Sequence, residues 1–185
     1  MNMINYKAKH FNYSVKYNIG LISLTGSKQK NPLTFESYGE LRDFFREINN
    51  CEDIDAIIFG SKNGNFCSGG SVNDIIGPLI KMNMKQLLNF TRMTGDLVKA
   101  MINCKKPIIA SIDGICVGAG AIIAMASDFR IASNQAKTAF LFITCSDGTS
   151  ILSFFFSLLN ILKLQLNDES LCGEPSGFLK VPSDK

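Results

Sequence analysis

The chain has 185 residues, 19 of them basic and 16 acidic, with a formal net charge of +3 and a mean hydropathy of +0.13. This length suits one domain with a substantial core, and the small charge without a run of like charges predicts no nucleic-acid partner. Six cysteines without a CxxC pair and a single histidine indicate reduced thiols, and they argue against Ser-His, Cys-His and zinc chemistry. Because the N-terminus lacks the apolar stretch of a secretory signal, we expect a cytoplasmic protein.

The first part of the chain predicts two strands, a helix and a third strand. Apolar residues alternate with polar ones over 11–17, and a second short strand follows over 21–24 after a turn. Thr34 is a predicted N-cap, because apolar residues recur behind it at helical spacing. These residues are Leu41, Phe44, Phe45 and Ile48. The wholly apolar run 56–59 is typical of a strand buried on both faces.

The alternation of strands and helices continues in the second part. Strands that alternate with helices predict an α/β fold with largely parallel pairing. The expected elements are a long helix over 87–102, a buried strand over 108–112, an alanine-rich helix over 121–126 and strands over 129–132 and 138–142.

An almost entirely apolar stretch occupies residues 151–164. It is shorter than the ~20 residues that a membrane-spanning helix needs. A buried helix is the main interpretation, and contact with a membrane surface is the minor alternative. A helix that is apolar on every side has to be surrounded, so we expect it to pack against a neighbouring subunit or to drive aggregation.

Two glycine-rich loops, 65–71 and 113–120, each follow a predicted buried strand and open a helix. Glycine lets another molecule approach the backbone closely, and N–H groups at a helix start favour negative charge. The two loops are candidates for an oxyanion hole, although either loop alone more often serves tight packing. A dinucleotide fingerprint is not present, because Ile123 stands where the third small residue belongs.

Several short sequence words occur together in one order and resemble the enoyl-CoA hydratase/isomerase family, also called crotonases. The resemblance extends from about Phe11 to Phe142. The words are Asn31-Pro32-Leu33-Thr34, Phe66-Cys67-Ser68-Gly69-Gly70, Lys106-Pro107-Ile108-Ile109-Ala110, Asp113-Gly114, Gly118-Ala119-Gly120, Ser127-Asp128 and Ala136-Lys137-Thr138-Ala139-Phe140.

The resemblance implies a crotonase-like repeated ββα superhelix with mostly parallel sheets. It implies a core over 1–142 and a homo-oligomer, either a trimer or a hexamer. Over 143–185 the sequence departs from the family pattern, which continues there through helices that cover the acyl pocket. We therefore expect a truncated or divergent C-terminal segment, with an apolar helix followed by a disordered tail.

The resemblance also implies site residues for an acyl-CoA thioester substrate. By motif position, the N–H groups of Gly70 and Ala119 are the oxyanion donors. Coenzyme A belongs to the substrate, so we expect no separate cofactor and no metal. The implied substrate contacts are Ser68, Gly69, Ser71, Val72 and Gly118.

Three positions depart from the family pattern. Ile122 stands where family hydratases carry a glutamate, and Ser71 replaces an aspartate found in many relatives. Asp147 is the candidate acid/base, with a solvated turn aspartate as the alternative. Two functional classes therefore remain open. One is an enoyl-CoA hydratase or double-bond isomerase, and the other is an acyl-CoA-binding or assembly module that lost the acid/base pair.

Overall fold

The computed structural model describes residues 3–25, 30–139 and 178–180. The strands within them are β1 (Phe11–Lys16), β2 (Ile19–Leu24), β3 (Ala56–Ser61), β4 (Ile108–Ile112), β5 (Ile115–Val117), β6 (Phe129–Ala132), β7 (Lys137–Ala139) and β8 (Phe178–Lys180). Six of them form a sheet in the order β1-β2-β3-β4-β6-β8, in which β1 and β2 are antiparallel and the other pairs parallel. β5 and β7 form a second, parallel sheet.

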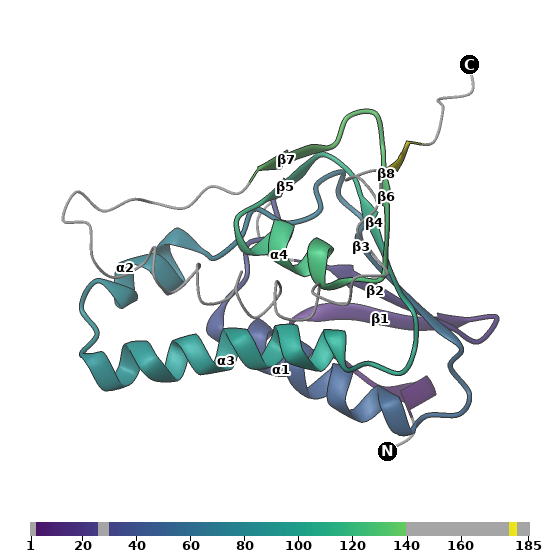
Figure 1. Ribbon diagram of the computed structural model, residues 1–185, viewed down its shortest axis with the longest axis horizontal. Helices are drawn as coiled ribbons and strands as arrows, with labels where there is room; N and C mark the ends of the chain where they lie inside the picture. Colours follow the sequence, from purple (N-terminus) through teal and green to yellow (C-terminus); the bar gives the residue numbers. More distant parts are fainter. Residues whose placement is uncertain (1–2, 26–29, 140–177, 181–185) are drawn as a thin grey trace, which may run out of the picture.

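The helices are α1 (Phe35–Glu47), α2 (Gly77–Leu79), α3 (Met84–Ile102) and α4 (Ala119–Ala126), with 3-10 turns at Met3–Asn5 and Ile48–Asn50 and a π-helix at Val72–Ile76. α1 lies alongside α3, and α4 contacts both α3 and β5 (Figure 1). The predicted α/β class with mostly parallel sheets is therefore confirmed.

The local signals in the sequence account for several element boundaries. The Ser37 N–H donates to Thr34 Oγ1 at 3.3 Å and the Thr34 N–H donates to Ser37 Oγ at 2.8 Å, so the predicted cap of α1 is confirmed as a reciprocal capping box. Tyr17 and Asn18 have φ of 52° and 60°, which suits a two-residue turn between antiparallel strands.

Four fully buried phenylalanines link α1 to the first glycine loop. Ring centroids are 5.6 Å apart for Phe44 and Phe45, 6.2 Å for Phe45 and Phe59, and 5.7 Å for Phe59 and Phe66. All three pairs meet edge to face, a geometry that stabilises by about 0.5–1.5 kcal/mol per pair beyond burial. The loop that follows Phe66 is thus anchored in the core.

The prediction that β3 is buried on both faces is wrong. Ile57 and Phe59 are buried, but Ile58 between them is only half-buried. The same alternation leaves Phe129 and Ile131 of β6 61% and 38% exposed. Successive side chains of a strand point to opposite faces, and the helices cover one face more completely than the other.

Glu40 of α1 holds the N-terminal segment in place. Its carboxylate accepts the N–H groups of Lys9 and His10 at 2.7 and 2.8 Å, and it lies 2.8 Å from His10 Nδ1. Burial raises the pKa of Glu40, but the hydrogen bonds from Lys9 and His10 outweigh this effect and leave the pKa below its usual value. The carboxylate therefore stabilises the fold while it is ionised.

Replacing Glu40 with glutamine is expected to lower the free energy of unfolding by about 1 kcal/mol at neutral pH, because an amide accepts these bonds less strongly. The pKa is depressed in the folded state, so the contribution is present above the unfolded pKa of about 4.3 and is lost below it. Urea unfolding of both proteins across this range measures the difference. The exposed-turn variant Glu52→Gln is the control, and a Glu40→Gln deficit that persists in acid would contradict the assignment.

Several sequence predictions lie outside the described residues. These are the core boundary at 142, the candidate Asp147 and the apolar segment 151–164. In the part of the chain that is described, no helix is long and apolar enough to cross a membrane.

Candidate active site at two glycine loops

The first glycine loop pairs with the segment that leads into α1. The Leu33 N–H donates to the Gly69 carbonyl at 2.8 Å, and the Ser71 N–H donates to the Leu33 carbonyl at 2.8 Å. In this parallel pattern the partner strand bonds the residues on either side of Gly70. The Gly70 N–H therefore faces away from Leu33, toward the other side of the loop.

The opposite side of the same loop pairs with β5. The Cys67 N–H donates to the Ile115 carbonyl at 2.9 Å, and the Val117 N–H donates to the Cys67 carbonyl at 3.0 Å. One rung earlier, the Phe66 N–H donates to the Asp113 carbonyl at 2.8 Å. The first loop thus runs between the start of α1 and the second loop, and it is bonded to both.

The second loop turns sharply into α4 at Gly118. Gly118 has φ of 56° and ψ of −124°, a conformation that favours glycine, and its N–H donates to the Ala139 carbonyl at 3.0 Å. The first turn of α4 closes when the Ile122 N–H donates to the Gly118 carbonyl at 3.2 Å. Ala119 is the first residue of α4, so its N–H has no acceptor within the helix and lies at the positive helix end.

The two loops touch at their glycines. A Cβ built on Gly69 would lie 3.1 Å from the Val117 carbonyl oxygen and 3.2 Å from the Ala119 nitrogen. Gly69 also has φ of 87°, which other residues rarely adopt. The two loops therefore lie side by side, as a shared oxyanion hole requires. Convergence of the Gly70 and Ala119 N–H groups on one oxygen stays a prediction.

The predicted substrate contacts differ in exposure and in bonding. Val72 is 70% exposed, whereas Ser71 is buried. The Ser71 hydroxyl donates to Asp74 Oδ2 at 2.6 Å and accepts the Asp74 N–H at 3.2 Å, which caps the π-helix. Sequence reasoning missed Asp74, although a serine followed three residues later by an acidic residue is a known capping signal. The backbone of Ser71 is bonded as well, because its N–H donates to the Leu33 carbonyl and its carbonyl accepts the Ile75 and Ile76 N–H groups at 2.9 and 3.1 Å.

Two cysteines, Cys67 and Cys116, each precede one of the two touching glycines by two residues. Burial raises the pKa of Cys67 to about 12, and the Gly69 N–H bond to its sulfur offsets only part of that effect. Burial likewise raises the pKa of Cys116 to about 11. Because the thiolate is the reactive form of cysteine, these buried thiols are inert near neutral pH.

Ile122 is buried in α4, a helix without a titratable side chain. Burial of the Ile122 side chain in this apolar helix fits a packing role in the core. An isoleucine side chain has no proton to transfer. Among the residues that the structure describes, no group of three His, Cys, Asp or Glu side chains is arranged to hold a metal ion.

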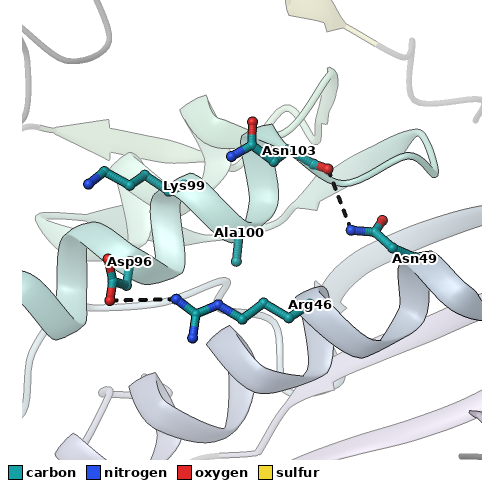
Figure 2. Close-up of a pocket in the computed structure, with 6 residues that line it drawn as sticks. All are labelled: Arg46, Asn49, Asp96, Lys99, Ala100 and Asn103. Carbon is teal, nitrogen blue, oxygen red and sulfur yellow. Dashed lines mark hydrogen bonds and ion pairs between the residues drawn. The ribbon is translucent and has the colours of Figure 1, made fainter.

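A pocket of about 260 Å³ lies between the C-terminal parts of α1 and α3 (Figure 2). Arg46 approaches Asp96 at 3.5 Å across it, and Asn49 Nδ2 donates to the Asn103 carbonyl at 3.5 Å. Leu33, which bonds the first glycine loop, precedes the other end of α1, so the pocket lies about one helix length, ~20 Å, from the loops. The pocket is separate from the candidate site.

The family model described as enoyl-CoA hydratase/isomerase matches residues 14–146. The chain belongs to this family. It is 31% identical over 122 residues to the 6-oxocyclohex-1-ene-1-carbonyl-CoA hydrolase of Thauera aromatica, with 65% of this chain and 32% of the relative aligned. It is 30% identical over 130 residues to the enoyl-CoA hydratase ACTT3 of Alternaria alternata, with 68% of this chain and 41% of the relative aligned.

Solved structures agree with the assignment. The enoyl-CoA hydratase of Bacillus anthracis superposes with a TM-score of 0.64 at 26% identity, over 70% of this chain and 50% of that one. A Streptomyces coelicolor A3(2) protein provisionally assigned as an enoyl-CoA hydratase superposes with a TM-score of 0.69 at 38% identity. The match covers 72% of this chain and 49% of that one. The crotonase-type fold is thereby shown. The chain spans about a third to a half of the length of these family members.

Proposed function

We propose that the protein binds an acyl-CoA thioester and that the N–H groups of Gly70 and Ala119 donate hydrogen bonds to its carbonyl oxygen. The observation that carries the proposal is the contact of Gly69 with Ala119, which leaves no space for a side chain between the loops. Both relatives described above are named for CoA compounds, although one is a hydrolase and the other a hydratase. Thioester binding is the property that these names share.

Two backbone donors on one oxygen would stabilise the negative charge that develops when a thioester becomes enolate-like. Such charge develops during water addition to an enoyl-CoA and during double-bond migration, so a hydratase or an isomerase reaction fits the site. The start of α4 adds a favourable electrostatic potential at Ala119. The exposed Val72, together with Ser68, Gly69, Ser71 and Gly118, is the proposed contact surface for the rest of the ligand.

Replacing Gly69 with alanine is expected to weaken acyl-CoA binding by more than about tenfold, a loss of ~1.4 kcal/mol or more. The added Cβ would press on the Ala119 nitrogen, and the φ of 87° would strain the loop further. Isothermal titration with a series of acyl-CoAs measures the dissociation constant. Gly64→Ala is the matched control, because Gly64 also has a positive φ, of 72°, but a Cβ there meets nothing within 4 Å.

Equal binding by wild type and Gly69→Ala, or equal losses in both alanine variants, would contradict the proposed site. In the first case the ligand would bind elsewhere, and in the second only backbone strain would matter. Absence of binding by the wild-type protein to any acyl-CoA would overturn the proposed function itself.

We further propose that the protein is a homo-oligomer, a trimer or a hexamer. Exposed Phe129 and Ile131 lie together on β6, and monomers rarely leave such apolar faces open. Light scattering at low micromolar concentration is expected to give a multiple of the 20.3 kDa chain mass. Phe129→Ser should shift the protein toward smaller species, whereas Tyr17→Ser at the exposed hairpin turn should not. A stable wild-type monomer would contradict the proposal.

A further inference from the structure

We infer that an asparagine cluster, formed by Asn31, Asn63 and Asn65, positions the first glycine loop against the second. The three residues come from two segments, one before α1 and one after β3. Asn31 is 1% exposed, although asparagine is seldom buried so completely. A buried amide costs free energy unless its hydrogen bonds are made, so the contacts of Asn31 explain its place in the core.

The Asn31 amide bonds in three directions. Asn31 Nδ2 donates to Asn63 Oδ1 at 2.7 Å and to the Asn65 carbonyl at 2.7 Å, with the Phe66 carbonyl 3.4 Å away. Asn31 Oδ1 accepts from Asn63 Nδ2 at 2.8 Å. The Asn31 side chain therefore bonds the backbone at the first two residues of the first glycine loop.

The backbone of Asn31 turns the chain toward that loop. Its φ of 48° lies in the left-handed region, which asparagine tolerates better than most residues. Behind this turn the Lys30 carbonyl accepts the Ser68 N–H at 2.9 Å, and Leu33 bonds Gly69 and Ser71. The turn and the amide together align the segment 30–33 along the loop.

Asn65 extends the connection to the other side. Its Oδ1 accepts the Ile115 N–H at 3.0 Å, next to the rungs that join Cys67 to Ile115 and Val117. Asn31 and Asn65 therefore tie three segments together, namely 30–33, 65–71 and 113–117. The relative position of the two loops, and hence of Gly70 and Ala119, depends on this connection.

The test separates positioning from a merely local role by hydrogen exchange. Asn31→Gly keeps the left-handed turn and removes the amide. The Val117 N–H bonds the side of the first loop that lies opposite the segment 30–33. Its exchange is expected to accelerate about tenfold or more, because its bond to the Cys67 carbonyl weakens when the loop is no longer held in place. Asn49→Ala is the matched control. Asn49 makes similar bonds, to the Lys105 N–H at 2.7 Å and the Asn103 carbonyl, but at the far end of α1.

Acceleration confined to 30–33 and 63–67, with Val117 as slow as in the wild type, would overturn the inference. If Asn31→Gly does not fold, Asn63→Ala takes its place, since it removes the reciprocal partner from an exposed position. A smaller acceleration of exchange, about threefold, is then expected at the Val117 N–H, and an unchanged exchange rate there would overturn the inference.

Acyl-CoA titration supplies a second readout, which rests on the proposed function. Asn31→Gly is expected to raise the dissociation constant about tenfold while Asn49→Ala leaves it unchanged. Equal affinities in wild type and Asn31→Gly would overturn the inference. A wild-type protein that binds no acyl-CoA would instead overturn the proposed function, and the exchange rates would still decide whether the cluster positions the loops.

Discussion

Replacing Gly120 with alanine is expected to separate α4 from the first glycine loop and to lower the free energy of unfolding by about 1–3 kcal/mol. A Cβ on Gly120 would lie 2.5 Å from the Cys67 carbonyl oxygen and 2.7 Å from the Cys67 Cβ. Cys67 cannot move away from the added Cβ, because its backbone is hydrogen-bonded to Ile115 and Val117. Denaturant unfolding measures the stability, and acyl-CoA titration is expected to show a parallel loss of binding as Ala119 moves away.

Gly39→Ala provides the matched control within α1. A Cβ on Gly39 meets nothing within 4 Å, so the same substitution should stabilise the protein by about 0.5–1 kcal/mol through helix propensity. Opposite signs for the two variants would show that contact with Cys67, and not helix propensity, decides the outcome at Gly120. A Gly120→Ala protein as stable as wild type would contradict the described packing.

Hydration of a short enoyl-CoA by the wild-type protein is expected to be slow or absent, because the family resemblance implies that Ile122 stands where hydratases carry a glutamate. Loss of one general acid/base typically lowers the rate by about 10²–10⁴-fold. Ile122→Glu is expected to raise the rate, measured as loss of the enoyl absorbance. Ile122→Gln has a similar shape without a proton to transfer, so it is the control and should not raise the rate.

The outcome at Ile122 also separates the two functional classes. Robust hydration by the wild-type chain would show that the catalytic position was assigned wrongly. Binding of acyl-CoA without hydration or double-bond migration would support the acyl-CoA-binding module, in which the loops persist without a proton-transfer pair. Double-bond migration without hydration would support the isomerase.

Local sequence signals were sufficient for much of the fold. The Thr34 cap and the helical spacing of Leu41 and Phe44 predicted α1, and short apolar runs predicted β3 and β4. Burial of β3 on both faces was predicted wrongly, because an apolar run does not reveal which face the helices cover. The sequence pattern therefore predicts individual helices and strands more directly than it predicts how they pack on each other.

The site was predictable in part. The family resemblance placed both loops, and their contact through Gly69 is confirmed. The asparagine cluster was missed, because Asn31 and Asn65 are 34 residues apart and only the folded chain brings them together. Asn65 and Ile115 are 50 residues apart, and no local pattern signals their bond. Side-chain bonds between distant loops are thus the part of the site that sequence periodicity cannot provide.

Nuclear magnetic resonance of the backbone amides, titrated with an acyl-CoA and separately with free coenzyme A, tests the central claim most directly. Free coenzyme A has no thioester carbonyl, so it should leave the Gly70 and Ala119 N–H resonances nearly unchanged. The acyl-CoA should move both resonances downfield together, since each N–H gains an acceptor at ~2.9 Å. Saturable acyl-CoA binding that moves neither resonance, or only one of them, would contradict an oxyanion site formed by the two loops.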